Sequence, residues 1–238
     1  MTTTLIIPGL NSSGPSHWQT WLEERIPRTA RVTQSDWHDA DLPGWASRVR
    51  REISRASGPV FIVAHSFGAL AAVQAAHDHA HRVLGALLVA PADPAMFGVT
   101  EYLPSEPLGF PTTVVASTND PWMAVERAAR WADLWEAEFI NLGAAGHINA
   151  DSGFGPWPEA LALIARLQRK SDTREAQPAR GESRVFKRAR GLRPQGSAIA
   201  RTRAIPAYNG DLMHAAVLLQ DAGWRVTPPK HWARVASA

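Results

Sequence analysis

The sequence contains no cysteine, and this absence excludes several kinds of chemistry. A chain without cysteine forms no disulfides, offers no thiolate ligands to a metal and has no cysteine nucleophile. It also lacks any apolar run of about eighteen residues, the length needed to span a membrane. The first apolar stretch, residues 5–7, is too short for a signal-peptide core and follows no basic residue. We therefore expect a cytoplasmic protein without membrane contact.

Charge is distributed unevenly along the chain. Residues 1–170 contain 13 Lys and Arg against 17 Asp and Glu, a net charge of −4, whereas residues 171–238 contain 12 against 5, a net charge of +7. The basic character therefore belongs to the C-terminal segment, and it does not indicate nucleic-acid binding by the rest of the chain.

The composition of the sequence changes around Lys170. Residues 170–181 are polar and lack periodicity, and an Arg-rich stretch follows them. Such a composition buries too little apolar surface to offset the entropy lost on ordering. We predict a folded domain at 1–170 and a basic, largely disordered extension at 171–238, with a short amphipathic helix near 211–222. Electrostatic contact with an acidic partner is our hypothesis for the extension.

Short apolar runs alternate with helical patterns through the first 170 residues. The runs are residues 5–7, 30–33, 60–64, 84–90, 113–116 and 138–142, and the helical patterns are residues 15–26, 42–56, 67–79, 121–136 and 156–168. Continuous apolar runs bounded by Gly or Pro are typical of strands covered on both faces. The alternation predicts the α/β class, with a single doubly wound, mostly parallel sheet of about six strands.

Residues 61–69 form the strongest local pattern. An apolar strand runs into Ser66, and an alanine-rich helix begins directly after it. This is the context of a nucleophile elbow, in which a strained turn holds the serine hydroxyl at the carboxyl edge of the sheet. The turn needs small residues two positions before and after the serine; Gly68 meets this need, and Ala64 replaces the usual glycine. The alternative is that Ser66 only caps the helix at 67–79.

A reactive serine needs a base, and the base needs an acid that fixes its tautomer. His147 lies in a glycine-flanked loop after the last predicted strand and suits the base, whereas His65 should point away from the serine hydroxyl. Asp120 is preferred as the acid because its strand directly precedes the one that delivers His147. Asp93, after the fourth strand, is the rival. Both are followed by proline, so both also fit a simple helix cap.

Two backbone N–H groups are expected to stabilise the oxyanion of an acyl-transfer reaction. One belongs to Phe67, directly after the serine, and the other to Leu10 in the glycine-containing loop at 8–14. This loop has neither the lysine of a phosphate-binding loop nor the glycine spacing of a dinucleotide-binding turn.

Tryptophan is abundant, with ten residues in the chain. Those near the predicted carboxyl edge, among them Trp37 and Trp45, could line an apolar acyl pocket or pack in the core. The residues that we expect to contact substrate are Asn11, Trp18 and Trp122.

Five short segments occur together in this order: residues 8–13, 17–18, 64–68, 119–121 and 146–149. Over residues 3–169 the chain resembles the small serine hydrolases grouped with retinoblastoma-binding protein 9 and the bacterial YdeN proteins. The resemblance implies an α/β-hydrolase fold with little or no lid, and a triad of Ser66, Asp120 and His147. It does not choose between ester, thioester and amide substrates.

We expect hydrolysis of a small carboxylic ester through an acyl-enzyme on Ser66. The expected substrate is a small acyl-bearing molecule, and neither a cofactor nor a metal is expected. Thioester hydrolysis and aminopeptidase-like cleavage of an amide or peptide are the alternatives among enzymes. A protein-binding scaffold with a vestigial site is the alternative outside enzymes, although such a scaffold would not need all three of serine, aspartate and histidine.

Overall fold

The computed structural model describes residues 1–175. The predicted helix near residues 211–222 and the hypothesis of an acidic partner for the basic extension lie outside these residues and stay predictions. Within the described part, residues 171–175 continue the last helix, α5 (Pro158–Glu175), where composition alone had suggested the start of the extension. Ser171 is buried in this turn, and Lys170 Nζ donates to Glu138 Oε2 at 2.7 Å. These contacts explain why α5 runs past residue 170.

The six predicted strands form one sheet with the order β2-β1-β3-β4-β5-β6. Every neighbouring pair is parallel. The strands are β1 (Thr3–Ile7), β2 (Thr29–Arg31), β3 (Val60–His65), β4 (Val83–Val89), β5 (Thr112–Ala116) and β6 (Glu138–Asn141). Each overlaps one of the apolar runs, and β3, next to the middle of the sheet, is buried along its whole length. The predicted doubly wound α/β sheet is confirmed.

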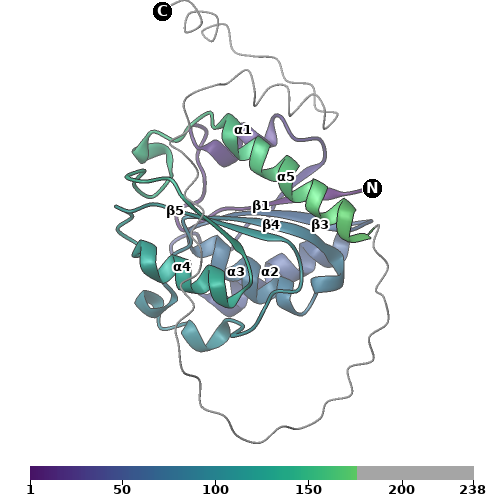
Figure 1. Ribbon diagram of the computed structural model, residues 1–238, viewed down its shortest axis with the longest axis horizontal. Helices are drawn as coiled ribbons and strands as arrows, with labels where there is room; N and C mark the ends of the chain where they lie inside the picture. Colours follow the sequence, from purple (N-terminus) through teal and green to yellow (C-terminus); the bar gives the residue numbers. More distant parts are fainter. Residues whose placement is uncertain (176–238) are drawn as a thin grey trace, which may run out of the picture.

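Helices cover both faces of the sheet (Figure 1). On one face lie α1 (Trp18–Glu23) and α5, and on the other lie α2 (Leu42–Arg55), α3 (Phe67–His77) and α4 (Val125–Leu134). The α2 helix buries one apolar stripe and leaves its arginines partly or fully exposed, which is the pattern of a surface helix. The α3 helix is buried on nearly all sides, as expected for a helix without a polar face.

Two helices begin three or four residues later than their sequence patterns suggested. The α1 helix starts at Trp18 because the His17 side chain caps it, accepting the N–H of Gln19. The α4 helix starts at Val125 because the Trp122 N–H donates to Asp120 Oδ1 at 2.9 Å, which holds the chain before α4 in a turn. Side chains therefore set both boundaries.

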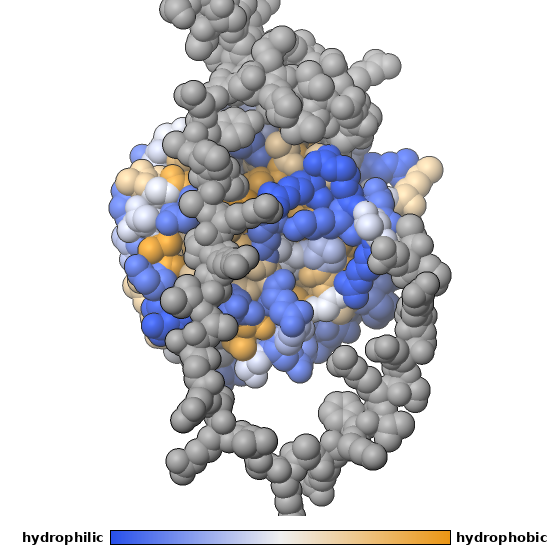
Figure 2. All heavy atoms as spheres, viewed as in Figure 1, coloured by the Kyte–Doolittle hydropathy of each residue, from blue (hydrophilic) through white to orange (hydrophobic). Residues whose placement is uncertain are grey.

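All six strands point the same way, so their carboxyl ends meet at one edge of the sheet. The loops that follow β1, β3, β5 and β6 gather at this edge, and they carry the predicted site residues. No helix within residues 1–175 is long and apolar enough to cross a membrane. Figure 2 shows hydrophilic and hydrophobic side chains interspersed on one face of this body.

Candidate active site

Ser66 occupies a strained turn between β3 and α3. Its φ is 55° and its ψ is −130°, a conformation that residues other than glycine rarely adopt. Its hydroxyl makes no capping hydrogen bond to α3, although the residue stands at the N-cap position. The backbone is instead fixed by donation from the Ser66 N–H to the Val89 carbonyl at 3.1 Å. A simple helix-cap role for Ser66 is therefore excluded, and its hydroxyl is left available for other contacts.

Two glycines allow the chain to pack tightly around this turn. A Cβ at Gly68 would lie 2.1 Å from the Pro8 carbonyl oxygen, so α3 can begin against the end of β1 only without a side chain there. A Cβ at Gly9 would lie 2.6 Å from the Ser66 Cβ. The loop after β1 therefore lies too close to the serine for a side chain at position 9. Ala64, which stands where a nucleophile elbow usually has glycine, is fully buried.

Three side chains from separate loops form a hydrogen-bonded chain at the sheet edge. His147 Nε2 lies 2.9 Å from Ser66 Oγ, and His147 Nδ1 lies 2.9 Å and 3.0 Å from the two carboxylate oxygens of Asp120. A carboxylate only accepts hydrogen bonds, so Nδ1 carries the proton and Nε2 is free to accept from the serine hydroxyl. The Asp120 side chain is only 2% exposed, which shields this contact from water.

Asp93, the rival acid, has a different set of partners. Its Oδ1 accepts the Ala95 N–H at 3.0 Å and caps the short 3₁₀ helix Pro94–Phe97, and it also accepts from Arg127 Nη2 at 2.7 Å. Neither contact involves His147. Asp93 is thus a helix cap in an ion pair, and Asp120 is the carboxylate that holds the imidazole.

The loop that presents His147 is held by side chains from several parts of the chain. Ser117 Oγ accepts the Ala145 N–H at 2.9 Å, and Asn119 Oδ1 accepts the Gly146 N–H at 2.6 Å. Ser152 Oγ accepts the N–H of His147 itself at 3.1 Å. Two further side chains donate to carbonyls of this loop: Trp18 Nε1 to that of Ile148 and His65 Nε2 to that of His147. Together, five side chains make hydrogen bonds to the backbone of residues 145–148.

The backbone next to the histidine is itself unusual. Ile148 has a φ of 48°, which a β-branched residue adopts only under constraint. Its side chain is fully buried, and Trp18 Nε1 donates to its carbonyl at 2.8 Å. Packing and this hydrogen bond together hold the strained residue, and so fix the direction in which His147 points.

Two further histidines lie beside the site, His17 and His65, and no role in the site was predicted for either of them. The His65 ring packs between the rings of His17 and His147, with centroid distances of 4.9 Å and 4.8 Å. Burial and the neighbouring His147 hold the pKa of His65 well below its usual value, although its hydrogen bond to the His147 carbonyl opposes the shift. Burial, followed by Arg31 and His147, lowers the pKa of His17 to about 4. Both rings are therefore neutral at pH 7.

A cavity of about 410 Å³ opens over Ser66 and His147. Leu10, Phe97 and Trp122 form its apolar wall, and most of the remaining lining is polar and includes Asn11, Asn149 and Asp151. Asn11 and Trp122, two residues expected to contact substrate, thus lie where a bound molecule would touch them. Trp122 is 40% exposed and its ring stacks on Phe97 at 6.3 Å.

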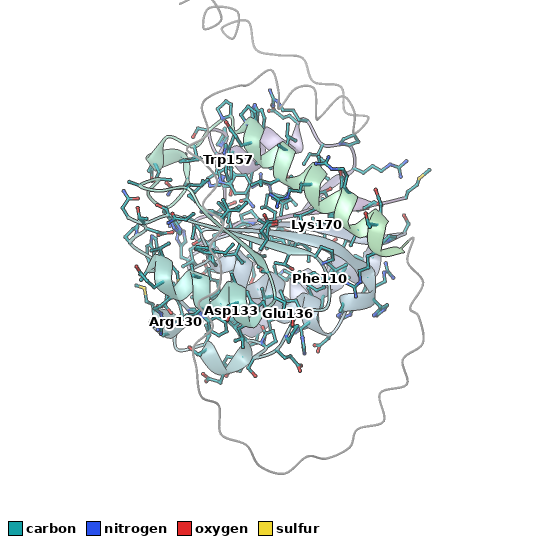
Figure 3. All side chains as sticks on the ribbon, in the orientation of Figure 1. Phe110, Arg130, Asp133, Glu136, Trp157 and Lys170 are labelled. Carbon is teal, nitrogen blue, oxygen red and sulfur yellow. The ribbon has the colours of Figure 1, made fainter. Side chains whose placement is uncertain are left out.

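Trp18 does not line the cavity, so the expectation that it contacts substrate is wrong. It is fully buried and meets Trp157 edge-to-face at 5.3 Å, beneath the start of α5, where Figure 3 labels Trp157. The sequence placed Trp18 near the carboxyl edge but could not show that α5 covers it. Trp37 and Trp45 also pack on each other, and Trp45 packs on Phe67, so they belong to the core below the site.

The two residues predicted to supply the oxyanion donors lie near the serine. Leu10 lines the cavity, and Phe67 directly follows Ser66 at the start of α3. Within residues 1–175, neither N–H donates to a backbone or side-chain acceptor. The same part of the chain shows no cluster of three or more His, Asp or Glu side chains suited to hold a metal ion. Chemically, the arrangement offers a serine hydroxyl, a base and two unpaired donors.

Comparisons with known proteins identify the family. The family model described as serine hydrolase matches residues 4–166. A protein of Pectobacterium atrosepticum described as a YdeN-like hydrolase is 41% identical, with a TM-score of 0.69, over 72% of this chain and 92% of that chain. No curated protein matches the chain.

More distant structures share the fold. The ydeN gene product of B. subtilis is 19% identical, with a TM-score of 0.59, over 70% of this chain and 98% of that one. Acyl-protein thioesterase 2 of Zea mays is 15% identical, with a TM-score of 0.50, over 71% and 93%. The sheet, the covering helices and the family match agree with one another. The chain belongs to the serine hydrolase family, as a YdeN-like member of the α/β-hydrolase superfamily.

Proposed function

We propose that this protein hydrolyses a small carboxylic ester through an acyl-enzyme on Ser66. The observation that carries the proposal is the hydrogen-bonded chain from Ser66 through His147 to Asp120, opening on the cavity. Membership of a serine hydrolase family supports a hydrolytic reaction, and the ester substrate and the acyl-enzyme on Ser66 are our proposal.

In the acylation step, Ser66 Oγ attacks the ester carbonyl and forms a new C–O bond. Its proton passes to His147 Nε2, which lies at hydrogen-bonding distance. Asp120 keeps the imidazole in the required tautomer and stabilises the imidazolium. When the tetrahedral intermediate collapses, the ester C–O bond breaks, and the departing alcohol takes the proton from His147.

The negative charge on the carbonyl oxygen needs donors that are already in place. We assign this role to the N–H groups of Leu10 and Phe67. Gly9 brings the loop of Leu10 against Ser66, because any side chain at position 9 would collide with the serine. Donors of this kind contribute on the order of 10²–10³ in rate each, because they are fixed before the charge develops.

In the deacylation step, water replaces the alcohol. His147 takes a proton from this water, the resulting hydroxide attacks the acyl carbon, and Ser66 leaves with the proton returned from His147. The products are a carboxylic acid and free enzyme. No atom or electron beyond those of ester and water is required.

An ester is favoured over an amide by the demand that each places on His147. An alkoxide is a much better leaving group than an amide anion, so breaking the C–N bond of an amide depends more strongly on a proton from His147 than breaking the C–O bond of an ester does. The apolar wall formed by Leu10, Phe97 and Trp122 offers a surface for an alkyl or aryl group.

Covalent labelling with a fluorophosphonate probe tests the nucleophile. We expect wild type to be labelled and Ser66→Ala not to be labelled. Ser171→Ala, which alters a buried serine on α5, is the matched control and should label like wild type. Equal labelling of wild type and Ser66→Ala would show that another residue reacts.

A substrate panel tests the choice of ester. Nitrophenyl esters, thioesters and aminoacyl amides with the same acyl group would be compared by kcat/KM. The proposal predicts the highest value for the ester relative to its uncatalysed hydrolysis rate, and a thioester or amide that exceeds it would reassign the substrate.

A further inference from the structure

His65 links the turn that carries Ser66 to the loop that carries His147. Its ring is buried, and Nε2 lies 3.0 Å from the His147 carbonyl oxygen. A carbonyl oxygen can only accept a hydrogen bond, so His65 Nε2 carries the proton and donates it. The residue directly before the serine therefore holds the backbone of the base.

Two consecutive residues thus contact His147 at two points. Ser66 Oγ meets the imidazole Nε2 at 2.9 Å, and His65 meets the main-chain carbonyl at 3.0 Å. Residues 65 and 66 follow each other at the end of β3, which is buried along its length. Both contacts therefore hold His147 in place relative to the end of the same buried strand, β3.

The other side of His65 is supported from α1. His17 packs its ring edgewise on His65 and accepts the Gln19 N–H at 3.2 Å through Nδ1. Gln19 Nε2 in turn donates to the carbonyls of Ile7, at the end of β1, and Val63, within β3. The start of α1 is therefore tied to the sheet, and its His17 and Trp18 rings pack on the imidazole of His65 on the side away from the cavity's apolar wall.

We propose that His65 is a positioning residue for the acyl transfer, which donates its Nε2 hydrogen to the His147 carbonyl and so keeps the His147 imidazole at the Ser66 hydroxyl. This inference rests on the proposed function of Ser66 and His147. It assigns His65 no contact with the reacting atoms.

A histidine suits this task better than an apolar residue or a cation. A buried N–H without an acceptor would destabilise the fold. The His147 carbonyl accepts from His65 Nε2, so the buried ring does not carry this cost. A neutral ring also adds no positive charge beside His147 when that residue takes the serine proton. The lowered pKa of His65, caused by burial, agrees with a neutral donor.

Variants at position 65 separate the hydrogen bond from packing. His65→Leu removes the donor, and His65→Gln keeps one, because the glutamine amide nitrogen lies about as far from the backbone as Nε2. The asparagine side chain of His65→Asn is too short for its amide to reach the His147 carbonyl. The Gln and Asn variants therefore compare a side chain that can donate to this carbonyl with one that cannot, and both side chains are polar. His79→Leu is the matched control, since His79 also contacts a carbonyl, that of Ala75, far from the site.

The rate of fluorophosphonate labelling would be measured as a function of probe concentration, together with the Tm of each variant. We expect the maximal labelling rate of His65→Leu and His65→Asn to fall about 100-fold, with the half-saturating probe concentration unchanged, because a small displacement of the base costs about that much. His65→Gln should recover to within about tenfold of wild type, and His79→Leu should match wild type.

Two results would overturn the inference. One is labelling of folded His65→Leu or His65→Asn at the wild-type rate. The other is a His65→Gln variant as slow as His65→Asn at the same Tm, which would leave packing as the explanation. Failure of wild type to label at all would instead refute the proposed function, so the two ideas fail separately.

Discussion

At the scale of single residues, two aspartates that look alike in sequence have different partners. Asp93 and Asp120 each follow a strand and precede a proline. Asp93 binds the Ala95 N–H and Arg127, whereas Asp120 binds His147. The difference lies in the direction of each carboxylate, which the sequence does not encode locally.

We expect Asp120→Ala to lower kcat/KM for a nitrophenyl ester by about 10³- to 10⁴-fold, because the imidazole loses the group that fixes its tautomer. Asp93→Ala should keep the catalytic rate and lose about 1–2 kcal/mol of unfolding free energy, since it removes a helix cap and a half-exposed ion pair. Steady-state kinetics and thermal unfolding of both variants measure these effects. The opposite ranking in kcat/KM would reassign the acid.

Gly68 gives a prediction in which local preference and packing oppose each other. A Gly→Ala change inside a helix usually stabilises by up to about 1 kcal/mol. Here the added methyl would lie 2.1 Å from the Pro8 carbonyl oxygen, a backbone atom that cannot move aside cheaply. We expect Gly68→Ala to lower the free energy of unfolding by about 1–3 kcal/mol. Chemical denaturation checks the sign, and a more stable variant would contradict the close approach of α3 to β1.

At the scale of elements, α1 supports the loop of His147 from beneath. Trp18 Nε1 donates to the Ile148 carbonyl, and the indole fills the space under α5. Trp122 lies instead on the cavity wall, with its N–H bound to Asp120 and its carbonyl bound to the Asp93 N–H. The two tryptophans should therefore affect stability and substrate binding differently.

We expect Trp18→Phe, which keeps a large ring but removes the indole N–H, to lower the free energy of unfolding by about 1–2 kcal/mol, because a buried carbonyl loses its partner. Trp122→Ala should raise KM for esters with an apolar group severalfold and leave Tm nearly unchanged, since this side chain is partly exposed. Kinetics and melting curves of the pair test the assignment. An increase in KM for Trp18→Phe alone would contradict it.

The sequence predicted the strands and the order of the site residues, but not the contacts between loops. Apolar runs bounded by Gly or Pro are local signals, so all six strands were found. The placement of Trp18 was wrong because burial by α5 depends on a helix about 140 residues away. The hydrogen bond of His65 joins residues 82 positions apart, and no local pattern indicates it. The later start of α4 likewise depends on the Asp120 side chain.

At the scale of the whole molecule, buried neutral histidines make stability depend on pH. The pKa of His17 is about 4 in the folded state, against an ordinary value of 6.5. Between these values the unfolded chain binds a proton that the folded chain does not, so the free energy of unfolding falls as pH decreases from about 6.5 to about 4. The full effect is about 3 kcal/mol, and His65 acts in the same direction.

His17→Asn tests this dependence. Asparagine can still cap α1 but does not titrate, so the variant should lose less stability than wild type over this pH range. His38→Asn, at an exposed histidine, is the control and should follow wild type. Urea denaturation at several pH values measures the slopes, and a His17→Asn slope equal to that of wild type would show that His17 is not held neutral by burial.

The molecule as a whole is a parallel sheet whose carboxyl edge brings together three side chains and the cavity above them. The proposed reaction passes through a covalent intermediate at one of these side chains. Rapid quenching of the protein during turnover of a nitrophenyl ester, followed by mass analysis of the peptides, detects that intermediate directly. We predict the acyl group on the peptide containing Ser66 and no turnover by Ser66→Ala. An acyl group on another residue, or full turnover by Ser66→Ala, would contradict the account.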